Sequence, residues 1–317
     1  MRTEGALVSS KESKTMQQVA PGVACLPIVF VNALMVGEPG GPWALVDSGL
    51  PKYAARIRRA AEERYGAGAK PEAIILTHGH FDHAGSALEL SEYWNVPVYA
   101  HPLELPYLTG KSPYPPQDPT VGGALALMSR FFPHRGINLG ERVRPLPADG
   151  RLPGMPGWAA YHTPGHTAGH TSFFREGDRT LIAGDALATV NQDSALAMLT
   201  KKQEFYRPPS PFTTDWQAAH QSVEKLAALR PVAVAAGHGV PMNGPGVAEE
   251  LAQFAENFTP PPKGRYVREP ALADENGITR LPPPVPDPLP AIVAGVGLAA
   301  LAGAAVTIAA RRSKDRT

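Results

Sequence analysis

The chain has 317 residues, of which 43% are hydrophobic, and a formal net charge of +1. A chain of this length can bury a substantial core, and its balanced charge excludes the broad positive field of nucleic-acid-binding proteins, so we expect no nucleic-acid partner. The single cysteine, Cys25, excludes an intramolecular disulfide, and its apolar neighbours predict a buried thiol rather than a nucleophile. Residues 1–17 are polar, lack the apolar core of a signal peptide and are expected to form a flexible N-terminus.

Apolar runs and helix-forming stretches alternate over the next part of the chain. The apolar runs predict strands, and the stretches between them are rich in alanine and charged residues, as expected for surface helices. The expected elements are strands at 23–31 and 42–46, a helix at 52–65, a strand at 72–76, a helix at 84–94 and a strand at 96–100. This alternation indicates a layered fold of helices and sheets.

The segment THGHFDHAG, residues 77–85, directly follows the strand expected at 72–76. It holds three histidines and an aspartate within six residues, and neutral imidazole and carboxylate are natural ligands of zinc-like cations. Side chains at i and i+2 of an extended segment point the same way, so His78 and His80 can hold one metal ion. Asp82 and His83 lie past the strand end and can face a second ion.

Between residues 101 and 146 the chain changes character, with six prolines from Pro102 to Pro119. Long structured loops in a compact domain are commonly lids or binding loops, so residues 103–135 are expected to form a rim or lid over the metal site. The alternative is a surface excursion that never touches substrate. The side chains expected to line the substrate pocket are Tyr107, Tyr114, Met128 and Phe131, together with Phe81 from residues 77–85, here called the metal loop.

The second half of the chain repeats the pattern of an apolar strand followed by a glycine and a metal-binding residue type. The expected elements are strands at 157–162, 171–175, 179–183 and 232–236, and helices at 213–229 and 247–257. His166, Asp185 and His238 each lie beside a glycine, which lets the backbone turn sharply and approach a site closely. Asp47 ends the strand at 42–46 in the same way.

Five motifs in this order resemble those of the metallo-β-lactamase superfamily. They are LVDSG at 45–49, THGHFDH at 77–83, TPGHTAGHT at 163–171, AGDA at 183–186 and AGHG at 236–239. The resemblance covers about residues 18–258, which we expect to be the catalytic domain. It implies an αββα four-layer sandwich, an α+β fold with two β-sheets between helices, which the alternation of elements alone does not give.

The resemblance also implies a dinuclear metal centre, and all seven ligands are present. They are His78, His80 and His166 for one ion, Asp82, His83 and His238 for the other, and Asp185 bridging both. The set favours two zinc ions, with manganese or iron as alternatives, because His/Asp sets accept all three. Asp47 is expected to hydrogen-bond a ligand, or to serve as a turn residue, and His170 to hydrogen-bond within its own turn.

The implied chemistry is hydrolysis by a metal-bridging hydroxide that attacks the carbonyl of a small-molecule ester, thioester or lactone. Asp82 and Asp185 are the expected catalytic carboxylates, because they can orient the nucleophile and Asp82 can pass a proton to the leaving group. His83 together with Asp185 resembles the glyoxalase II and lactonase branches. Residues 107–123 look like the same segment in a group of bacterial probable metallo-hydrolases.

Two other readings stay open at this point. One is an oxidative enzyme of the same fold, such as a persulfide dioxygenase with a single iron, which the complete second ligand set disfavours. The other is a non-catalytic, membrane-tethered scaffold, which the intact ligand set as a whole disfavours.

After the catalytic domain the composition shifts twice. Ten prolines predict an extended linker over 259–290, and the uncharged residues 291–310 predict a single transmembrane helix before a basic tail at 311–317. We therefore expect a membrane protein with a C-terminal anchor. The basic tail favours a cytoplasmic C-terminus, whereas the lack of an export signal favours a cytoplasmic catalytic domain. Gly295, Ala299 and Gly303 share one helical face, which suggests self-association through this helix.

Overall fold

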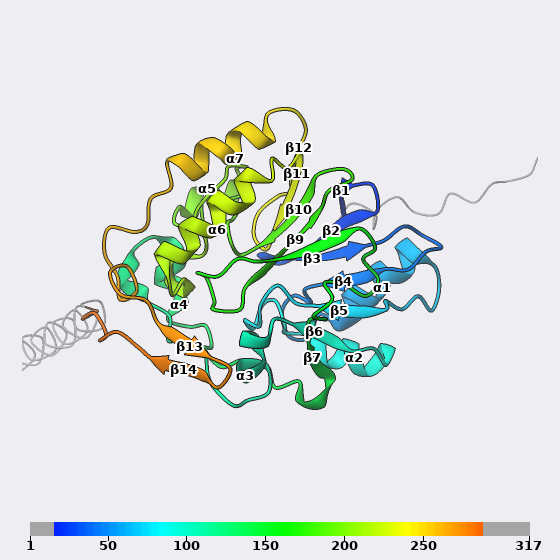
Figure 1. The fold of residues 1–317 in the computed structure, drawn as a ribbon, viewed down its shortest axis with the longest axis horizontal. Coiled ribbons are helices and arrows are strands. Elements are labelled where there is room, and N and C mark those ends of the chain that lie inside the picture. The colour runs from blue at the N-terminus through cyan, green and yellow to red at the C-terminus, as the bar shows by residue number, and fades with distance from the viewer. Residues whose placement is uncertain (1–15, 288–317) are drawn as a thin grey trace, which may run out of the picture. The chain divides into compact units, whose positions relative to one another are not determined.

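Two β-sheets lie face to face, with helices on their outer sides (Figure 1). The computed structural model describes residues 16–287, so most of the predicted flexible N-terminus lies outside the described residues. The first sheet has seven strands in chain order: β1 (Gln17–Ala20), β2 (Val23–Ile28), β3 (Val31–Val36), β4 (Ala44–Val46), β5 (Ala73–Ile75), β6 (Val98–Ala100) and β7 (Val143–Pro145). Strands β1 to β4 pair antiparallel, and β4 to β7 pair parallel.

The second sheet has five strands, in the order β12-β11-β10-β9-β8. Their bounds are β8 (Trp158–His162), β9 (Thr171–Arg175), β10 (Thr180–Gly184), β11 (Ala233–Ala236) and β12 (Met242–Asn243). Strands β10 and β11 are parallel, and the other pairs are antiparallel.

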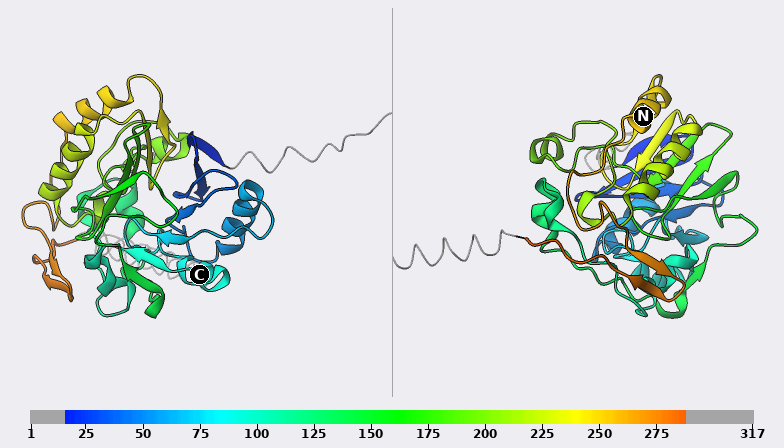
Figure 2. Two further views of the ribbon diagram at one scale, coloured as in Figure 1. Left: turned by 45° about the vertical axis from the view of Figure 1, so that its right-hand side comes forward. Right: turned by 60° about the vertical axis from the view of Figure 1, so that its left-hand side comes forward.

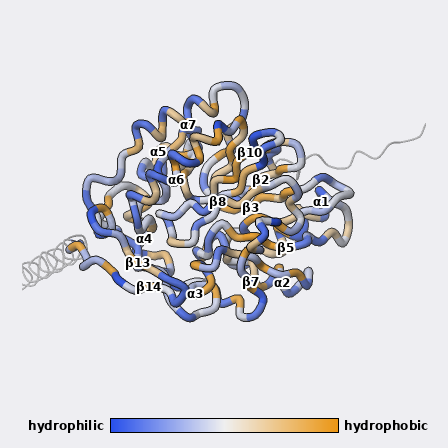
Figure 3. Tube along the Cα trace, in the orientation of Figure 1, coloured by the Kyte–Doolittle hydropathy of each residue, from blue (hydrophilic) through white to orange (hydrophobic). Residues whose placement is uncertain are grey.

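Side chains that alternate along each strand produce three apolar layers, because successive residues of a strand point to opposite faces. In β5, Ile74 packs with the outer helices whereas Ile75 faces the other sheet. In β10, Leu181 faces its outer helices and Ile182 the space between the sheets. The central strands β4, β5, β10 and β11 are buried on both faces and are mostly apolar along their length (Figure 3). Cys25 lies in the layer between the sheets, where burial raises the pKa of its thiol to about 12, as expected for a buried strand cysteine.

Four amphipathic helices cover the outer faces. Helices α1 (Ala54–Tyr65) and α2 (Ala87–Trp94) pack on the first sheet, and α6 (Trp216–Ala228) and α7 (Val247–Glu256) on the second (Figure 1). Helix α6 begins at the N-cap residue Asp215, whose carboxylate accepts a hydrogen bond from the Ala218 amide. The predicted four-layer sandwich is therefore confirmed.

Shorter elements build the segment 102–142 and the loop before α6. They are α3 (Leu105–Leu108), α4 (Ala124–Ser129), α5 (Ala195–Thr200) and 3-10 turns at Pro102–Glu104, Pro119–Val121, Gly140–Arg142 and Ser210–Phe212. The segment 102–142 thus has helical turns of its own, and it contacts the metal loop through Tyr114, whose ring lies 4.4 Å from that of His80.

Part of the predicted linker 259–290 forms structure against this segment. Strands β13 (Leu272–Asp274) and β14 (Gly277–Arg280) make a two-stranded hairpin (Figure 2). Upstream of the hairpin, Tyr266 is 2% exposed and donates a hydrogen bond to the Pro116 carbonyl over 2.7 Å. The predicted division of the chain into catalytic domain, linker and tail stays a prediction.

The transmembrane part of the predicted fold class, and the membrane localisation with it, are corrected. A bilayer span needs about 20 apolar residues in one helix, and among residues 16–287 no helix is long and apolar enough to cross a membrane. The longest helix within these residues, α6, has 13 residues and exposes Gln217, Gln221 and Glu224. The predicted span at 291–310 and the tail at 311–317 lie outside the described residues.

Candidate metal centre

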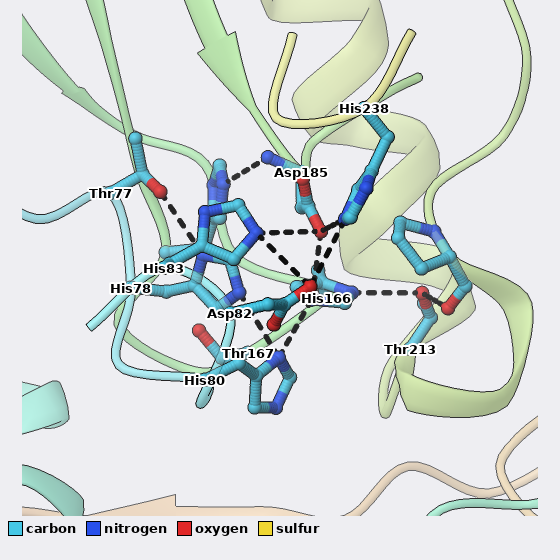
Figure 4. Close-up of polar contacts among 12 residues, drawn as sticks. Thr77, His78, His80, Asp82, His83, His166, Thr167, Asp185, Thr213 and His238 are labelled. Carbon is cyan, nitrogen blue, oxygen red and sulfur yellow. Dashed lines mark hydrogen bonds and ion pairs between the residues drawn. The ribbon is translucent and has the colours of Figure 1, made fainter. Parts of the chain in front are cut away.

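The carboxyl ends of two pairs of parallel strands meet at one edge of the sandwich. Asp47 follows β4, residues 78–83 follow β5, Asp185 follows β10 and His238 follows β11, while His166 comes from the loop between β8 and β9. Five segments far apart in sequence thus converge on one place, and Figure 4 shows the four that carry residues 78–83, His166, Asp185 and His238.

Ligand atoms from the metal loop and from His166 form one group. Nε2 of His78 lies 3.0 Å from Nδ1 of His80, and this Nδ1 lies 3.0 Å from Nε2 of His166. These three histidines can surround one metal ion, since their ligand atoms all lie within 4.8 Å of one another. Their arrangement corresponds to the first ligand set implied by the sequence.

A second group consists of Asp82, His83 and His238, whose ligand atoms also lie within 4.8 Å of one another. Asp185 lies between the two groups. Its Oδ2 is 3.1 Å from Nε2 of His238, 3.4 Å from Nε2 of His83 and 3.5 Å from Nε2 of His166. One carboxylate oxygen is therefore close to ligands of both groups, which is the position that a bridging ligand needs.

Hydrogen bonds fix the tautomers of the histidines. Nδ1 of His83 donates to Asp47, and Nδ1 of His238 to the Phe30 carbonyl, each over 2.8 Å. The Thr77 hydroxyl donates to Asp47, so it accepts from Nδ1 of His78.

His166 shows the same pattern as the other three histidines. Its Nδ1 lies 3.3 Å from the Thr213 hydroxyl, which donates to the Pro209 carbonyl and therefore accepts from the imidazole. In all four histidines Nδ1 faces an outer acceptor, which leaves Nε2 pointing to the centre. Such partners are typical of metal-bound histidines.

The donor set fits divalent cations. Nε2 of His83 and Oδ1 of Asp185 are buried without a hydrogen-bond partner among the described residues. Burial and neighbouring imidazoles lower the pKa of His80 to about 3 and that of His78 well below its usual range. Although burial opposes its ionisation, His238 and His83 hold the pKa of Asp185 well below its usual range. Although burial opposes protonation, the neighbouring carboxylates, Asp185 above all, raise the pKa of His238 and raise that of His83 well above its usual range. A bound cation would take the place of these protons, because histidine binds a metal ion in its neutral form.

Two glycines allow the strands to end this close together. A Cβ on Gly237 would lie 2.0 Å from Oδ1 of Asp185. Gly184, with φ of +56°, would place a Cβ 2.6 Å from Nε2 of His170. That Nε2 accepts a hydrogen bond from the Asp185 amide over 2.8 Å, so His170 lies behind Asp185. His170 is also within hydrogen-bonding distance of Thr163, a residue of its own turn.

Glu104 is a buried residue of the site region that the sequence did not single out. Its Oε1 accepts hydrogen bonds from the Thr167 hydroxyl and the Gly169 amide, and its Oε2 from the Gly79 amide and the Tyr114 hydroxyl. Burial raises the pKa of Glu104, and these four donors oppose the rise. The carboxylate thereby joins the metal loop, the His166 loop and the segment 103–135.

A pocket of about 480 Å³, part of it open to solvent, lies over the metal centre. Phe81 and Tyr114 line it, as the sequence suggested. The other suggested rim residues lie elsewhere: Tyr107 is buried behind Tyr114, and Met128 and Phe131 are exposed and outside the lining that the described residues provide.

The pocket is also lined by three aromatic residues that the sequence analysis did not indicate. Phe30 comes from the turn between β2 and β3, Phe132 follows α4, and Phe212 lies in the 3-10 turn before α6. An aromatic pair at residues 131 and 132 was visible in the sequence, but the structure turns the second ring inward and leaves the first 86% exposed.

Comparisons with known proteins agree with this geometry. The family model of the metallo-beta-lactamase superfamily matches residues 26–238. The probable metallo-hydrolase YflN of Bacillus subtilis is 42% identical over 245 residues, covering 76% of this chain and 93% of that protein. The hydroxyacylglutathione hydrolase GloC of Haemophilus influenzae is 30% identical over 114 residues, covering 36% of this chain and 49% of its own.

A solved structure shows the same fold. It is a metallo-beta-lactamase from Cronobacter sakazakii, a HARLDQ motif mutant, with a TM-score of 0.52 and 21% identity, covering 77% of this chain and 95% of that chain. The family model and the long match to the Bacillus protein extend the likeness from fold to family. The chain therefore belongs to the metallo-β-lactamase superfamily, as a metallo-hydrolase.

Proposed function

We propose that the chain is a dinuclear metal-dependent hydrolase of esters, thioesters or lactones. The observation that supports this most is the position of Oδ2 of Asp185, which lies within 3.5 Å of ligand atoms from both groups. Two divalent ions, for which zinc is our first candidate, would supply Lewis acidity and lower the pKa of water so that it can attack a carbonyl near neutral pH.

The residues of the chain itself would orient the reactants. Asp82 and Asp185 line the pocket above the histidines, where carboxylate oxygens can accept hydrogen bonds from the attacking water. Oδ2 of Asp82 lies 3.6 Å from Nε2 of His238 at the pocket floor, so Asp82 can also carry a proton toward the leaving group. The rings of Phe81 and Phe132 line the pocket with their centroids 5.4 Å apart and would limit the entry of bulk water.

The test combines metal analysis with turnover. Purified protein should contain about two transition-metal ions per chain and should hydrolyse simple esters or lactones. His80→Ala and Asp185→Ala should abolish this turnover, and His220→Ala, a substitution on α6, should leave it unchanged. A single iron per chain would favour the oxidative reading, and unchanged rates in both variants would refute the site.

A further inference from the structure

The pocket over the metal centre is mostly apolar apart from the metal-binding side chains, with His134 and Gln192 as its two other polar lining residues. Its walls come from four phenylalanines, Phe30, Phe81, Phe132 and Phe212, together with Leu125, Tyr114 and three prolines. Phe132 lies at the middle of this aromatic wall, with ring centroids 5.8 Å from Phe30, 5.4 Å from Phe81 and 6.2 Å from Phe212. Four separate segments of the chain thus contribute to one hydrophobic surface.

No lysine or arginine is among the side chains that line this pocket in the described part of the chain. The Tyr114 hydroxyl donates its hydrogen bond to Glu104, so Tyr114 presents its ring to His80. Near the pocket, Arg207 is paired with Asp193 over 2.6 Å. A substrate carboxylate placed against the aromatic wall, away from the metal-binding side chains, would lose its hydration without gaining a lysine or arginine partner, which is costly.

We propose that this pocket binds an uncharged apolar acyl or aryl group, so that the substrate is a neutral hydrophobic ester or lactone rather than an anionic one. This inference rests on the proposed hydrolase function and names its substrate class. In the reaction, the oxygen of water bonds to the acyl carbon, and the bond from that carbon to the alcohol oxygen breaks. One proton of water goes to the leaving alcohol, and the other is released as the product acid ionises.

The proposal can be tested with two esters that differ only at the far end of the acyl chain. These are 4-nitrophenyl hexanoate and the mono-4-nitrophenyl ester of adipic acid, which carries a terminal carboxylate. For the metal-loaded full chain, kcat/KM should be about a hundredfold higher for the hexanoate. Equal rates, or a preference for the adipate, would overturn the substrate class while leaving the hydrolase function intact.

A binding measurement keeps the substrate class testable if no ester is turned over. Hexanophenone, which is neutral, and 6-oxo-6-phenylhexanoate, which carries a carboxylate, have no bond to hydrolyse. Calorimetry should show that the neutral ketone binds at least about tenfold more tightly. Tight binding of the neutral ketone without any ester hydrolysis would refute the proposed function but support the apolar pocket. Equal binding of both ketones would refute the pocket assignment.

Two neighbouring phenylalanines provide a matched pair of variants. Phe132→Ala removes the centre of the aromatic wall and should lower the ratio of hexanoate to acetate ester turnover by about tenfold. Phe131→Ala removes a ring that is 86% exposed and should leave that ratio unchanged. The same ratio in both variants would contradict the assignment.

A second pocket beside the first could bind an anionic substrate instead. It shares Phe30, Gln192 and His238 with the first but is also lined by Lys201. A preference for the adipate ester that disappears in Lys201→Ala would place the substrate in that pocket and would overturn the proposal.

Discussion

Oδ2 of Asp47 lies 2.8 Å from Nδ1 of His83, and the same oxygen accepts a hydrogen bond from the Thr77 hydroxyl over 2.8 Å. That hydroxyl in turn accepts from Nδ1 of His78. One carboxylate behind the site therefore sets the tautomer of one histidine in each ligand group. Asp47 has φ of +57°, a conformation that asparagine also tolerates, so its charge can be removed without disturbing the turn.

We expect Asp47→Asn to fold but to bind metal more weakly. An amide nitrogen facing His83 would favour the tautomer with the proton on Nε2, which blocks coordination. Affinity for one of the two ions should fall by about 10–100-fold, the usual effect of losing such a partner. Competition with a chromogenic chelator measures this, and Asp149→Asn, at an exposed aspartate, is the control. Two ions bound as tightly as before would show that Asp47 has only a turn-forming role.

Glu104→Gln should destabilise the protein. A glutamine has one oxygen and one NH₂ group where the carboxylate accepts four hydrogen bonds, so at least one buried amide would lose its partner. The expected loss in the free energy of unfolding is about 1–3 kcal/mol. Urea denaturation gives this value, and Glu63→Gln, at an exposed position on α1, should change it little. Identical midpoints for the two variants would argue against the role assigned to Glu104.

Gly237→Ala should disrupt the metal centre directly. The added methyl group would lie 2.0 Å from Oδ1 of Asp185 and 2.6 Å from Cε1 of His83, so at least one of them must move. Elemental analysis should find less than the wild-type metal content. Gly177→Ala, where a methyl group meets nothing within 4 Å, should keep the full content. Full metal content in Gly237→Ala would contradict the close approach seen here.

The stability of the protein should fall in acid partly through His101. Burial and the stacked His162 lower the pKa of His101 to about 4, and its Nδ1 caps the turn that carries Glu104 by accepting from the Leu103 amide. The unfolded state, with a pKa of about 6.5, binds this proton first, so the free energy of unfolding drops as pH falls from about 6.5 to 4.

His101→Asn keeps an acceptor at the cap and does not titrate. Its melting temperature should therefore fall less between pH 7 and pH 4.5 than that of the wild type. His134→Asn, at an exposed histidine, should show the wild-type fall. If His101→Asn also shows that fall, His101 contributes nothing to the acid response.

Motifs that are local in sequence could be read before the structure was known. The residues His78 to His83 lie on one loop, so their type and spacing indicated a metal site. The alternation of apolar runs and helix-forming stretches indicated a layered fold, and the resemblance to the metallo-β-lactamase superfamily implied the two-metal hydrolytic centre. Continuous apolar runs predicted the central strands because these strands, such as β4, β5, β10 and β11, are buried on both faces.

Residues that act through distant partners could not be found in this way. Glu104 is one glutamate in a proline-rich segment, and its four donors come from three other parts of the chain. Phe30, Phe132 and Phe212 meet only after folding. The hairpin β13–β14 did have a local signal, Asn276-Gly277, which is typical of tight turns between strands. The proline content around it masked that signal.

The four hydrogen bonds of Glu104 also limit how this enzyme could be remodelled. The segment that supplies Tyr114 and Phe132 to the pocket shares its carboxylate with the two loops that supply His80 and His166. A rim transplanted from a relative would therefore have to bring an equivalent carboxylate, or the Gly79 and Gly169 amides beneath it would be left without an acceptor. In this protein, a change to the segment that lines the pocket would therefore also affect the loops that hold the metal-binding histidines.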